Sequence, residues 1–507
     1  MKFFPTAAKA ACIGALAICS SLAFSQFSGT ADWGASTSFT GGAVAAACDS
    51  SGGTYNGYVY VLLIVPLTGG PAAHPVPELS EEAAYYAPRD KSTFAILSKA
   101  PAGSDLARLS TEIKSAPAMP AAATASKFIT GTKYAVIAYN ASGTYEWGHS
   151  YVGMGGYSFY TPEAITVNGG NIYCTGYCNV GLQQVQIGSP ATSPTTLYTI
   201  DISEATPTTF NYSYYNNTTD MSTAPQDIGL GIATDSNGNV LVSGSHAFGS
   251  GSGTFVQVVG FTSSLGSPAA YLTTYAGSAP YICRNKTSGA VAEGTATILS
   301  NKYVYVGGYS YASGAVSNAF SDTYTSGSGV QCSGSGICVG NNYIYAAGSS
   351  PNSLSFYDFV LQIPESSPTT VTAGCNTSTW TTPYVVTADG TDHVYVGGIL
   401  NGVEAAGYAS TNLTTAMWSS NYAQRLKKTG GIIGIATDGS HVYVGATQMN
   451  NVAVGFNAST GALEAANVAE PSNALAFAFN SNTLRVILTG WTGTTAPTGT
   501  TFTYQYH

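Results

Sequence analysis

The chain is poor in charged residues. Asp, Glu, Lys and Arg make up only 8% of its 507 residues, against about 25% in an ordinary globular protein. The hydrophobic fraction is a normal 44%, so the low charge does not indicate a disordered chain. The net charge is −9 and no long basic run occurs, which leaves no electrostatic footprint for nucleic acid. We therefore expect neutral or cationic partners and not DNA or RNA.

Long apolar runs are scarce as well. The first lies at the N-terminus, where Lys2 and Lys9 precede or flank the run "AACIGALAICSSLAFS". This order of charged and then apolar residues is typical of a signal peptide, and the small residues before Gln26 suit cleavage there. No later run approaches the roughly 18 to 20 residues of a membrane-spanning helix. We expect a leader at 1–25 and a mature chain of 26–507, exported to the periplasm, the cell surface or the medium without a transmembrane helix.

Cysteine is infrequent, and its spacing matters more than its number. Seven of the nine cysteines remain once the leader is removed, and export permits disulfides. Two close pairs are predicted to close small loops, Cys174 with Cys178 and Cys332 with Cys338. The odd total leaves at least one thiol unpaired or paired between chains. No CxxC or CxxCH motif occurs and no histidine flanks either pair, so we predict no metal site and no cofactor.

The motifs of common enzyme classes are also missing. The chain has no G-x-S-x-G, no H-E-x-x-H and no Gly-rich phosphate loop that opens a helix. Among the few histidines, only His149 in "EWGHSYVG" has a neighbour, Glu146, typical of acid–base chemistry. His393 and His441 occupy equivalent turn positions and are expected to face solvent. A site assembled from distant residues leaves no motif, so an enzyme stays an alternative to the non-enzymatic function that we favour.

What the sequence does contain is a repeat. The phrase "GIATDSNGNVLVSGS" at 231–245 returns as "GIATDGSHVYVGA" at 434–446. Looser copies lie at 164–177, 296–310, 336–350, 385–399 and 475–490, with a poorer one at 45–63. Each copy has a β-branched run, a polar turn and a second apolar run, which predicts a β-hairpin. Turn residues such as Asp235 and Asp438 are expected to accept hydrogen bonds from the backbone and not to bind calcium, because the distal acidic ligand is missing.

The repeat continues beyond the hairpin. Further strand-like stretches follow, such as "TFVQVVGFTSS" at 254–264 and "TAMWSSNYA" at 415–423. Three to four short antiparallel strands per roughly 50 residues are typical of a β-propeller blade, which only neighbouring blades can cover. The chain stops after a third strand at 500–507, and "TADWGASTSF" at 30–39 has the fourth-strand pattern. We predict an all-β single propeller of eight blades, or seven if 45–63 is not a hairpin, closed by the N-terminal strand that completes the last blade.

A family resemblance supports this architecture. The stretch "GIATDSNGNVLVSG" followed by "TFVQVVGFTSSLGSPAAYLTTYAG" resembles the SBBP-type bacterial β-propeller repeat, most clearly over 230–465. The double glycines Gly307-Gly308 and Gly397-Gly398 are more weakly similar to those of kelch blades. The resemblance implies an exported or cell-surface protein of propeller architecture. It implies no catalytic residues, because such families share a scaffold and differ in function.

One stretch departs from the repeat. Residues 66–126 carry 11 charges, and "SDLARLSTEIKSA" within them places apolar residues at helical spacing after Ser104, a suitable N-cap. We predict a partly helical insertion in the first blade. It would act as a lid or docking element over one mouth of the propeller, or lie as a decoration on the side of the blade.

Candidate binding residues lie in a predicted loop between two blades, the part of a propeller that carries ligand sites. In "NYAQRLKKTGG", the side chains of Arg425, Lys427 and Lys428 are close enough to capture a carboxylate or sulfate, or they remain solvated. We expect a monomeric, exported binding or interaction module for glycan, peptide or protein, with His149 as a further site residue. The alternative is an exported propeller enzyme, a lyase or hydrolase, with carboxylates and a histidine at one channel mouth.

Overall fold

The structure, a computed structural model, consists of strands and contains no helix among the residues it describes. The described residues are 33–40, 42–50, 52–66, 132–151, 159–179, 195–216, 226–248, 253–285, 289–298, 301–324, 331–351, 356–368, 370–371, 373–377, 383–399, 402–422, 431–447, 451–468, 473–480, 485–492 and 500–506. The all-β prediction is therefore confirmed for this part of the chain. The leader at 1–25 and the insertion at 66–126, with its predicted helix, lie outside it, apart from Pro66 at the end of a strand.

The strands pair in antiparallel groups. In the first half of the chain they are β2 (Gly42–Cys48), β3 (Val59–Pro66), β4 (Thr132–Tyr139), β5 (Tyr145–Tyr151); β6 (Phe159–Asn168), β7 (Asn171–Asn179), β8 (Thr195–Ser203), β9 (Phe210–Tyr215); β10 (Gln226–Thr234), β11 (Val240–Ala247), β12 (Thr254–Phe261), β13 (Ala269–Arg284); β14 (Ala290–Ile298), β15 (Asn301–Ala312) and β16 (Ala315–Tyr324).

The second half repeats the pattern. Its strands are β17 (Ser333–Val339), β18 (Tyr343–Pro351), β19 (Phe356–Pro364), β20 (Ala373–Thr377); β21 (Pro383–Ala388), β22 (Val394–Ile399), β23 (Val403–Tyr408), β24 (Trp418–Tyr422); β25 (Gly431–Thr437), β26 (His441–Thr447), β27 (Asn451–Asn457), β28 (Leu463–Val468); β29 (Asn473–Asn480), β30 (Arg485–Thr492), β31 (Thr500–Tyr506) and, from the N-terminal side, β1 (Trp33–Thr40). From β17 on, the strands form four separate four-stranded sheets, the last of which includes β1, whereas β2 to β16 form one 15-stranded sheet. Within this large sheet, single parallel pairs link β4 to β6 and β8 to β10, and β13 is shared by two groups.

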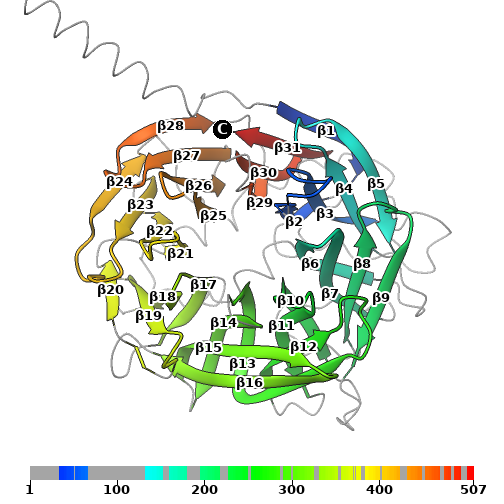
Figure 1. Cartoon of the computed structure of the whole chain (residues 1–507), viewed down its shortest axis with the longest axis horizontal. Helices are drawn as coiled ribbons and strands as arrows, with labels where there is room; N and C mark the ends of the chain where they lie inside the picture. The colour runs from blue at the N-terminus through cyan, green and yellow to red at the C-terminus, as the bar shows by residue number, and fades with distance from the viewer. Residues whose placement is uncertain are drawn as a thin grey trace, which may run out of the picture.

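The groups stand side by side around a common axis, as in a β-propeller. Figure 1 shows β2, β6, β10, β17, β21, β25 and β29 nearest the centre, and β5, β9, β16, β20, β24 and β28 along the outside. The two ends of the described chain meet in one group, where β1 pairs antiparallel with β31 and Gly34 lies opposite Tyr504. The predicted pairing of the N-terminal strand with the last strand is thus present.

The strand β13 is 16 residues long and belongs to two groups. Its first half pairs with β12 up to Ala276, and its second half pairs with β14 from Ala276 to Arg284. The first strand of the next group is therefore the second half of β13, and β14 and β15 are the second and third strands. The hairpin predicted at 296–310 is present and consists of β14 and β15. It forms the second and third strands of its group and not the first and second, because the second half of β13 precedes it.

A glycine recurs in the second strand of most groups for a steric reason. The first strand of each group has a register shift, and outside the β2–β5 group a glycine lies opposite this shift. A Cβ atom on Gly176 would overlap the carbonyl oxygen of Thr161, and one on Gly244 would overlap that of Ile228. Only glycine allows the bulged strand to approach so closely. Gly397 lies in a second strand, opposite the register shift of the first strand. Gly307 lies in the third strand of its group, so the two glycines are not equivalent.

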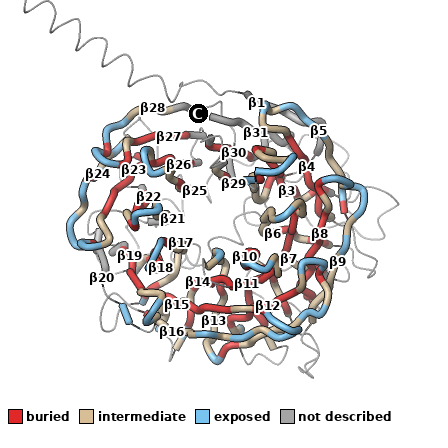
Figure 2. The backbone as a smooth tube through the Cα atoms, viewed as in Figure 1, coloured by how far each residue is buried: buried red, intermediate tan, exposed pale blue. Residues whose placement is uncertain are grey.

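The core lies between neighbouring groups and not within them. Tyr60 and Leu62 of β3 form one buried cluster with Ile172 and Ile200 of the next group. Ile487 of β30 packs in another cluster that contains residues of β3. Figure 2 shows the buried residues concentrated on the middle strands, and exposed residues on the outermost strands and in the turns. Each group thus depends on its neighbours for burial, as the repeat predicted.

Candidate functional site

The predicted basic cluster, Arg425, Lys427 and Lys428, falls within 423–430, outside the described residues. The strand β24 ends at Tyr422 and β25 begins at Gly431. These strands belong to different groups, so the segment connects two groups. Its role as an anion site stays a prediction.

His149 lies on β5, the outermost strand of its group, opposite Val136 of β4. Its ring stacks on that of Trp147, with centroids 5.8 Å apart and the planes at 24°. Glu146 is the extra residue at a register shift between Tyr145 and Trp147, and no hydrogen bond or ion pair joins it to His149. The Oε1 of Glu146 accepts a hydrogen bond from Nδ2 of Asn140 at 2.5 Å. The two residues therefore do not form an acid–base pair.

The two predicted disulfides were wrong, because Cys174, Cys178, Cys332 and Cys338 form no disulfide bonds. Cys174 and Cys178 both lie on β7, and four residues of extended strand span about 13 Å. Bridged cysteines need Cα atoms within about 7 Å of each other. Cys332 directly precedes β17 and Cys338 lies near its end, so the same geometry applies. A short spacing closes a loop only where a turn separates the two cysteines, and here a strand does.

A pocket lies where the first strands of four successive groups end. The strands β2, β6, β10 and the second half of β13 each contribute their last residues or the residues that follow. The pocket has a volume of about 430 Å³ and is called the mouth pocket below. Its lining consists of Asp49, Ser50, Thr166, Val167, Asn168, Ile232, Ala233, Thr234, Ile282, Cys283 and Arg284. Because the first strands are innermost, this pocket lies at the inner rim of the propeller.

Turns fix the strand ends at this rim. After β6 the chain reverses at Gly169 and Gly170, which both have positive φ, a conformation that glycine adopts without strain. After β10 the Oδ1 of Asp235 accepts the backbone N–H groups of Asn237 and Asn239, each at 2.8 Å. This confirms the turn role predicted for Asp235. The ends of β6 and β10 are therefore held in place by local interactions.

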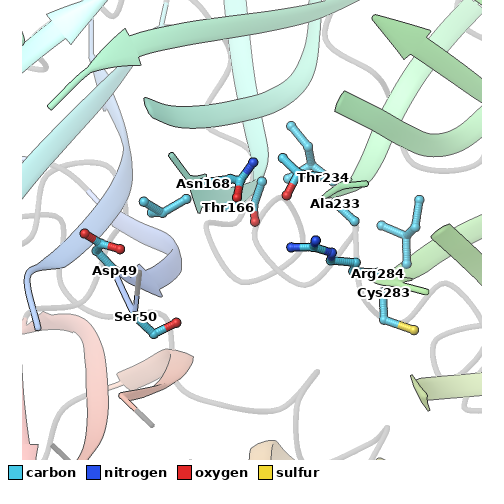
Figure 3. Close-up of a pocket in the computed structure, with 11 residues that line it drawn as sticks. Asp49, Ser50, Thr166, Asn168, Ala233, Thr234, Cys283 and Arg284 are labelled. Carbon is cyan, nitrogen blue, oxygen red and sulfur yellow. The ribbon is translucent and has the colours of Figure 1, made fainter. Parts of the chain in front are cut away.

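The mouth pocket carries opposite charges on two sides. Figure 3 shows the side chain of Arg284 reaching into the pocket, Asp49 on the far side, and Thr166, Asn168 and Thr234 between them. Arg284 is exposed, and its guanidinium has no hydrogen-bond or ion-pair partner within the described part of the chain. A guanidinium in this situation is available for a bidentate bond to a carboxylate.

A second carboxyl group lies near Asp49. Glu204 follows β8 and is only 3% exposed, as is Asp49. Burial raises the pKa of Glu204 to about 7; the nearby hydroxyl of Tyr60 lowers it in part, and the charge of Asp49 raises it further. The backbone N–H of Glu204 donates to the carbonyl oxygen of Gly170 at 3.0 Å. The side of the pocket opposite Arg284 is therefore acidic.

A buried His–Asp pair was missed by the sequence analysis. The Nδ1 of His246 lies 2.9 Å from Oδ1 of Asp227, and both side chains are fully buried. The two residues face each other across β10 and β11, near the start of β10 and away from Thr234 at the mouth pocket. Without access to solvent this pair holds two strands together and meets no substrate. It lies just outside the repeated phrase, so no pattern pointed to it.

Two histidines complete turns. The Nδ1 of His393 lies 3.0 Å from Oδ2 of Asp389, and that of His441 lies 2.9 Å from Oδ2 of Asp438. In both turns the tyrosine two residues further along donates its hydroxyl to the same carboxylate. Burial alone would raise the pKa of each aspartate. Hydrogen bonds from Thr391 and His393 to Asp389, and from His441 and Ser440 to Asp438, outweigh burial and hold each pKa below its usual value. The side chain of His393 is 41% exposed, as expected, whereas that of His441 is only 16% exposed.

The residues of the mouth pocket did not stand out in the sequence, although part of the signal was present. Asp49, Asn168 and Thr234 occupy the ends of the first strand in three of the recognised copies. Aligning the copies would have placed these residues at one rim. Arg284 carried no such signal, because the second half of β13 had not been recognised as a first strand.

No group of three or more His, Cys, Asp or Glu side chains among the described residues is placed to hold a metal ion. No helix in the same residues is long and apolar enough to cross a membrane.

No protein family and no curated protein matches the sequence. Among solved structures, the chain is similar to the Dos1 propeller at a TM-score of 0.47 and 10% identity, over 73% of this chain and 88% of that one. It is also similar to two quinohemoprotein alcohol dehydrogenases, ADHIIG from Pseudomonas putida HK5 and that of Comamonas testosteroni. For both, the TM-score is 0.35, the identity is 10% and 75% of this chain is covered, together with 65% and 66% of theirs.

Proposed function

We propose that the protein is an exported, monomeric β-propeller that acts as a binding module for glycan, peptide or protein, and that the mouth pocket is its ligand site. One observation carries the proposal. Arg284 is exposed in a pocket of about 430 Å³ and has no partner among the described side chains. Charged residues are rare in this chain, and one that makes no contact stabilising the fold is a candidate for ligand binding.

The rest of the lining favours binding over catalysis. Thr166, Asn168 and Thr234 offer neutral donors and acceptors, and the lining includes a single carboxyl group, that of Asp49, and no histidine. A lyase or hydrolase needs an acid and a base that face the same substrate. The side chains that line the mouth pocket instead suit a ligand that is held by hydrogen bonds and charge pairing. We therefore place the binding function ahead of the enzymatic alternative.

The scaffold that we propose for this site is a closed ring of eight blades, of the SBBP type suggested by the repeat. The pairing of β1 with β31 supports closure, and so does the contact of β2 with β29. The shared strand β13 supports the count, because it supplies the first strand that the β14–β16 group would otherwise lack. Closure would fix the spacing of the four strand ends, since every blade would then be packed on both faces.

We propose the other predicted features as elements of the opposite rim. The insertion at 66–126 joins the end of β3 to the start of β4. Because β3 runs antiparallel to β2, its end lies away from Asp49 and the mouth pocket. A lid formed by the insertion would therefore cover the other mouth of the channel. The basic cluster Arg425, Lys427 and Lys428 precedes a first strand, and by the same reasoning we propose it as a contact at that rim.

The proposal is tested on glycan and peptide arrays with the mature chain, residues 26–507. Each ligand that binds is then titrated against Arg284→Ala and against Lys302→Ala. The control removes the same charge from a half-exposed position on β15, outside the pocket. We expect at least a tenfold loss for Arg284→Ala and none for Lys302→Ala. Absence of binding on every array, or equal binding by both variants, would contradict the proposal.

A further inference from the structure

From the side chains that line the mouth pocket we infer that its ligand is a uronic acid residue of a glycan, whose carboxylate binds Arg284 and whose hydroxyl groups bind the neutral polar side chains nearby. The inference rests on the proposed function and names the class of ligand. Three features of the pocket support it: one guanidinium group, three neutral polar side chains and an apolar surface.

The guanidinium group selects a carboxylate. Arg284 is the last residue of β13, and its side chain extends into the pocket (Figure 3). It is the only cationic side chain among the described residues of the lining. Guanidinium binds carboxylate through two parallel N–H···O bonds, which fixes the orientation of the ligand as well as its charge. Asp49, at the far side of the pocket, already has an interaction within the chain, so we assign it no contact with the ligand.

Three neutral polar side chains face the same space. Thr166, Asn168 and Thr234 lie along the pocket beside Arg284 (Figure 3). None of the three makes a side-chain hydrogen bond to another described residue. A Thr hydroxyl both donates and accepts hydrogen bonds, and an Asn amide does so through two atoms. Each hydroxyl of a sugar also donates and accepts, so the two sets of groups are complementary.

The placement of these side chains favours a sugar over a peptide. Thr166 and Asn168 are two residues apart on β6, so they lie on one face about 7 Å from each other. Thr234 lies at the end of the neighbouring first strand, β10. A sugar carries its hydroxyl groups around a compact ring and can meet several of these side chains at once. The C-terminal end of a peptide offers one amide per residue, about 3.3 Å apart along the chain, so fewer of its polar groups reach the pocket together with the carboxylate.

An apolar surface lies among these polar groups. Val167, Ile232 and Ile282 belong to the same lining. A sugar ring has C–H groups on its faces, and their burial against aliphatic side chains removes apolar surface from water. An inorganic anion such as phosphate or sulfate has no apolar group that would cover these residues. A carboxylate attached to a sugar ring therefore suits both parts of the lining.

Size and net charge agree with a single uronic acid residue. A volume of about 430 Å³ is within the range of small-molecule pockets and excludes a folded partner. The net charge of −9 repels anions, but at physiological ionic strength this repulsion is screened beyond about 8 Å. A ligand with one carboxylate bears a small penalty, and a polyanion bears a larger one. The net charge thus predicts neutral or cationic partners in general, and the local charge of Arg284 makes this pocket an exception.

The test is a calorimetric titration of the mature chain with the methyl glycosides of glucuronate, galacturonate and mannuronate. Each is compared with the methyl glycoside of its parent hexose, in which a neutral hydroxymethyl group replaces the carboxylate. We expect at least one uronide to bind, and its parent hexoside to bind about ten- to a hundredfold more weakly, because one charged hydrogen-bonded contact is lost. A disaccharide that ends in the preferred uronic acid should bind more tightly than the free sugar acid. The reverse order would assign the pocket to a free sugar acid and overturn the glycan assignment.

Variants locate the contacts. Arg284→Ala should bind the uronide as weakly as the hexoside, and it should bind the hexoside as the wild type does. Arg284→Lys keeps the charge without the fork and should bind the uronide with intermediate affinity. Thr166→Val keeps the shape and removes a hydroxyl, so it should weaken the binding of uronide and hexoside by the same factor, about two- to tenfold. Lys302→Ala, outside the pocket, should bind as the wild type does.

The comparison of uronide with hexoside on the wild-type protein also covers the case in which a variant fails to fold. Equal binding of the two would overturn the inference, and so would tighter binding of glucose 6-phosphate than of any uronide. Trialanine in place of a sugar, with binding lost in Arg284→Ala, would overturn the sugar assignment and leave the pocket as the ligand site. A neutral glycan that binds the wild type and Arg284→Ala equally would overturn the inference while a binding function elsewhere remained. Failure of every ligand would overturn the inference and the proposed function together.

Discussion

The buried carboxyl group of Glu204 should make the protein less stable as the pH rises. Burial raises the pKa of this group from 4.5 to about 7, with a smaller opposing effect of the nearby Tyr60 hydroxyl. Between these two pH values the folded protein holds a proton that the unfolded chain has released. The stabilising contribution is therefore complete below about pH 4.5 and is lost as the pH rises through about 7.

The size of the effect follows from the pKa difference. One pKa unit corresponds to about 1.4 kcal/mol, so ionising Glu204 in the folded protein costs about 3 kcal/mol at pH 8. The substitution Glu204→Gln keeps the shape and removes the ionisation. We expect equal free energies of unfolding for the variant and the wild type at pH 4, and a variant more stable by up to about 3 kcal/mol at pH 8. Urea denaturation of the mature protein at pH 4, 6 and 8, followed by tryptophan fluorescence, measures this difference.

A matched control is available on β5. Glu146 is exposed, and Glu146→Gln should shift the urea midpoint equally at all three pH values. If Glu204→Gln differs from the wild type by the same amount at pH 4 and pH 8, the burial of an unpaired carboxyl group does not control this pH dependence. The reasoning would then be refuted, whatever the absolute stability of the variant.

Three further changes test the architecture. Gly244→Ala places a methyl group against a backbone carbonyl and should lower the free energy of unfolding by about 3 kcal/mol. Gly390→Ala is the control: its methyl group meets nothing within 4 Å, so it should change the free energy of unfolding by less than about 0.5 kcal/mol. Urea denaturation of the two variants compares these values. Asp438→Ala should destabilise by about 2 kcal/mol at pH 7 and by less at pH 3, because protonation already weakens the turn in the wild type and its lowered pKa confines that loss to acidic pH. Cys174 and Cys178 are buried thiols, so a reducing agent should leave the melting temperature unchanged; a fall of several degrees would indicate a bridge.

The outermost strands were predictable because their role imposes a residue type. Trp418 lies on β24, within the strand-like stretch predicted at 415–423, and Trp147 lies on β5. Trp418 is 7% exposed and donates its indole N–H to the carbonyl oxygen of Ala458 in the next group at 2.6 Å. A large ring with one donor closes the outer edge of the space between two sheets. The same requirement in several groups produces a pattern that a single sequence reveals.

The β13–β14 hairpin was not predictable, because a buried acid interrupts its pattern. Glu293 lies on β14, next to Gly294 at the register shift. It is fully buried and accepts the backbone N–H of Ser335 in the next group at 3.2 Å, and burial raises its pKa well above the usual value. A glutamate where other copies have small or apolar residues made the following hairpin the better match. The repeat was therefore aligned one strand too far along the chain in this group, with β14 and β15 taken in place of β13 and β14.

The site itself depends on the strand that the sequence concealed. Where two groups are joined by a loop, the position of the first strand depends on how that loop folds. Here β13 passes from the outermost place of one group to the innermost place of the next, with Gly277 at positive φ where it changes partners. Its pairing with β12 and β14 leaves Arg284 little freedom. A repeat alignment can show which residues are equivalent. Arg284, however, lies on a strand that departs from the repeat, so its place at the pocket becomes evident only from the strand pairing in the structure.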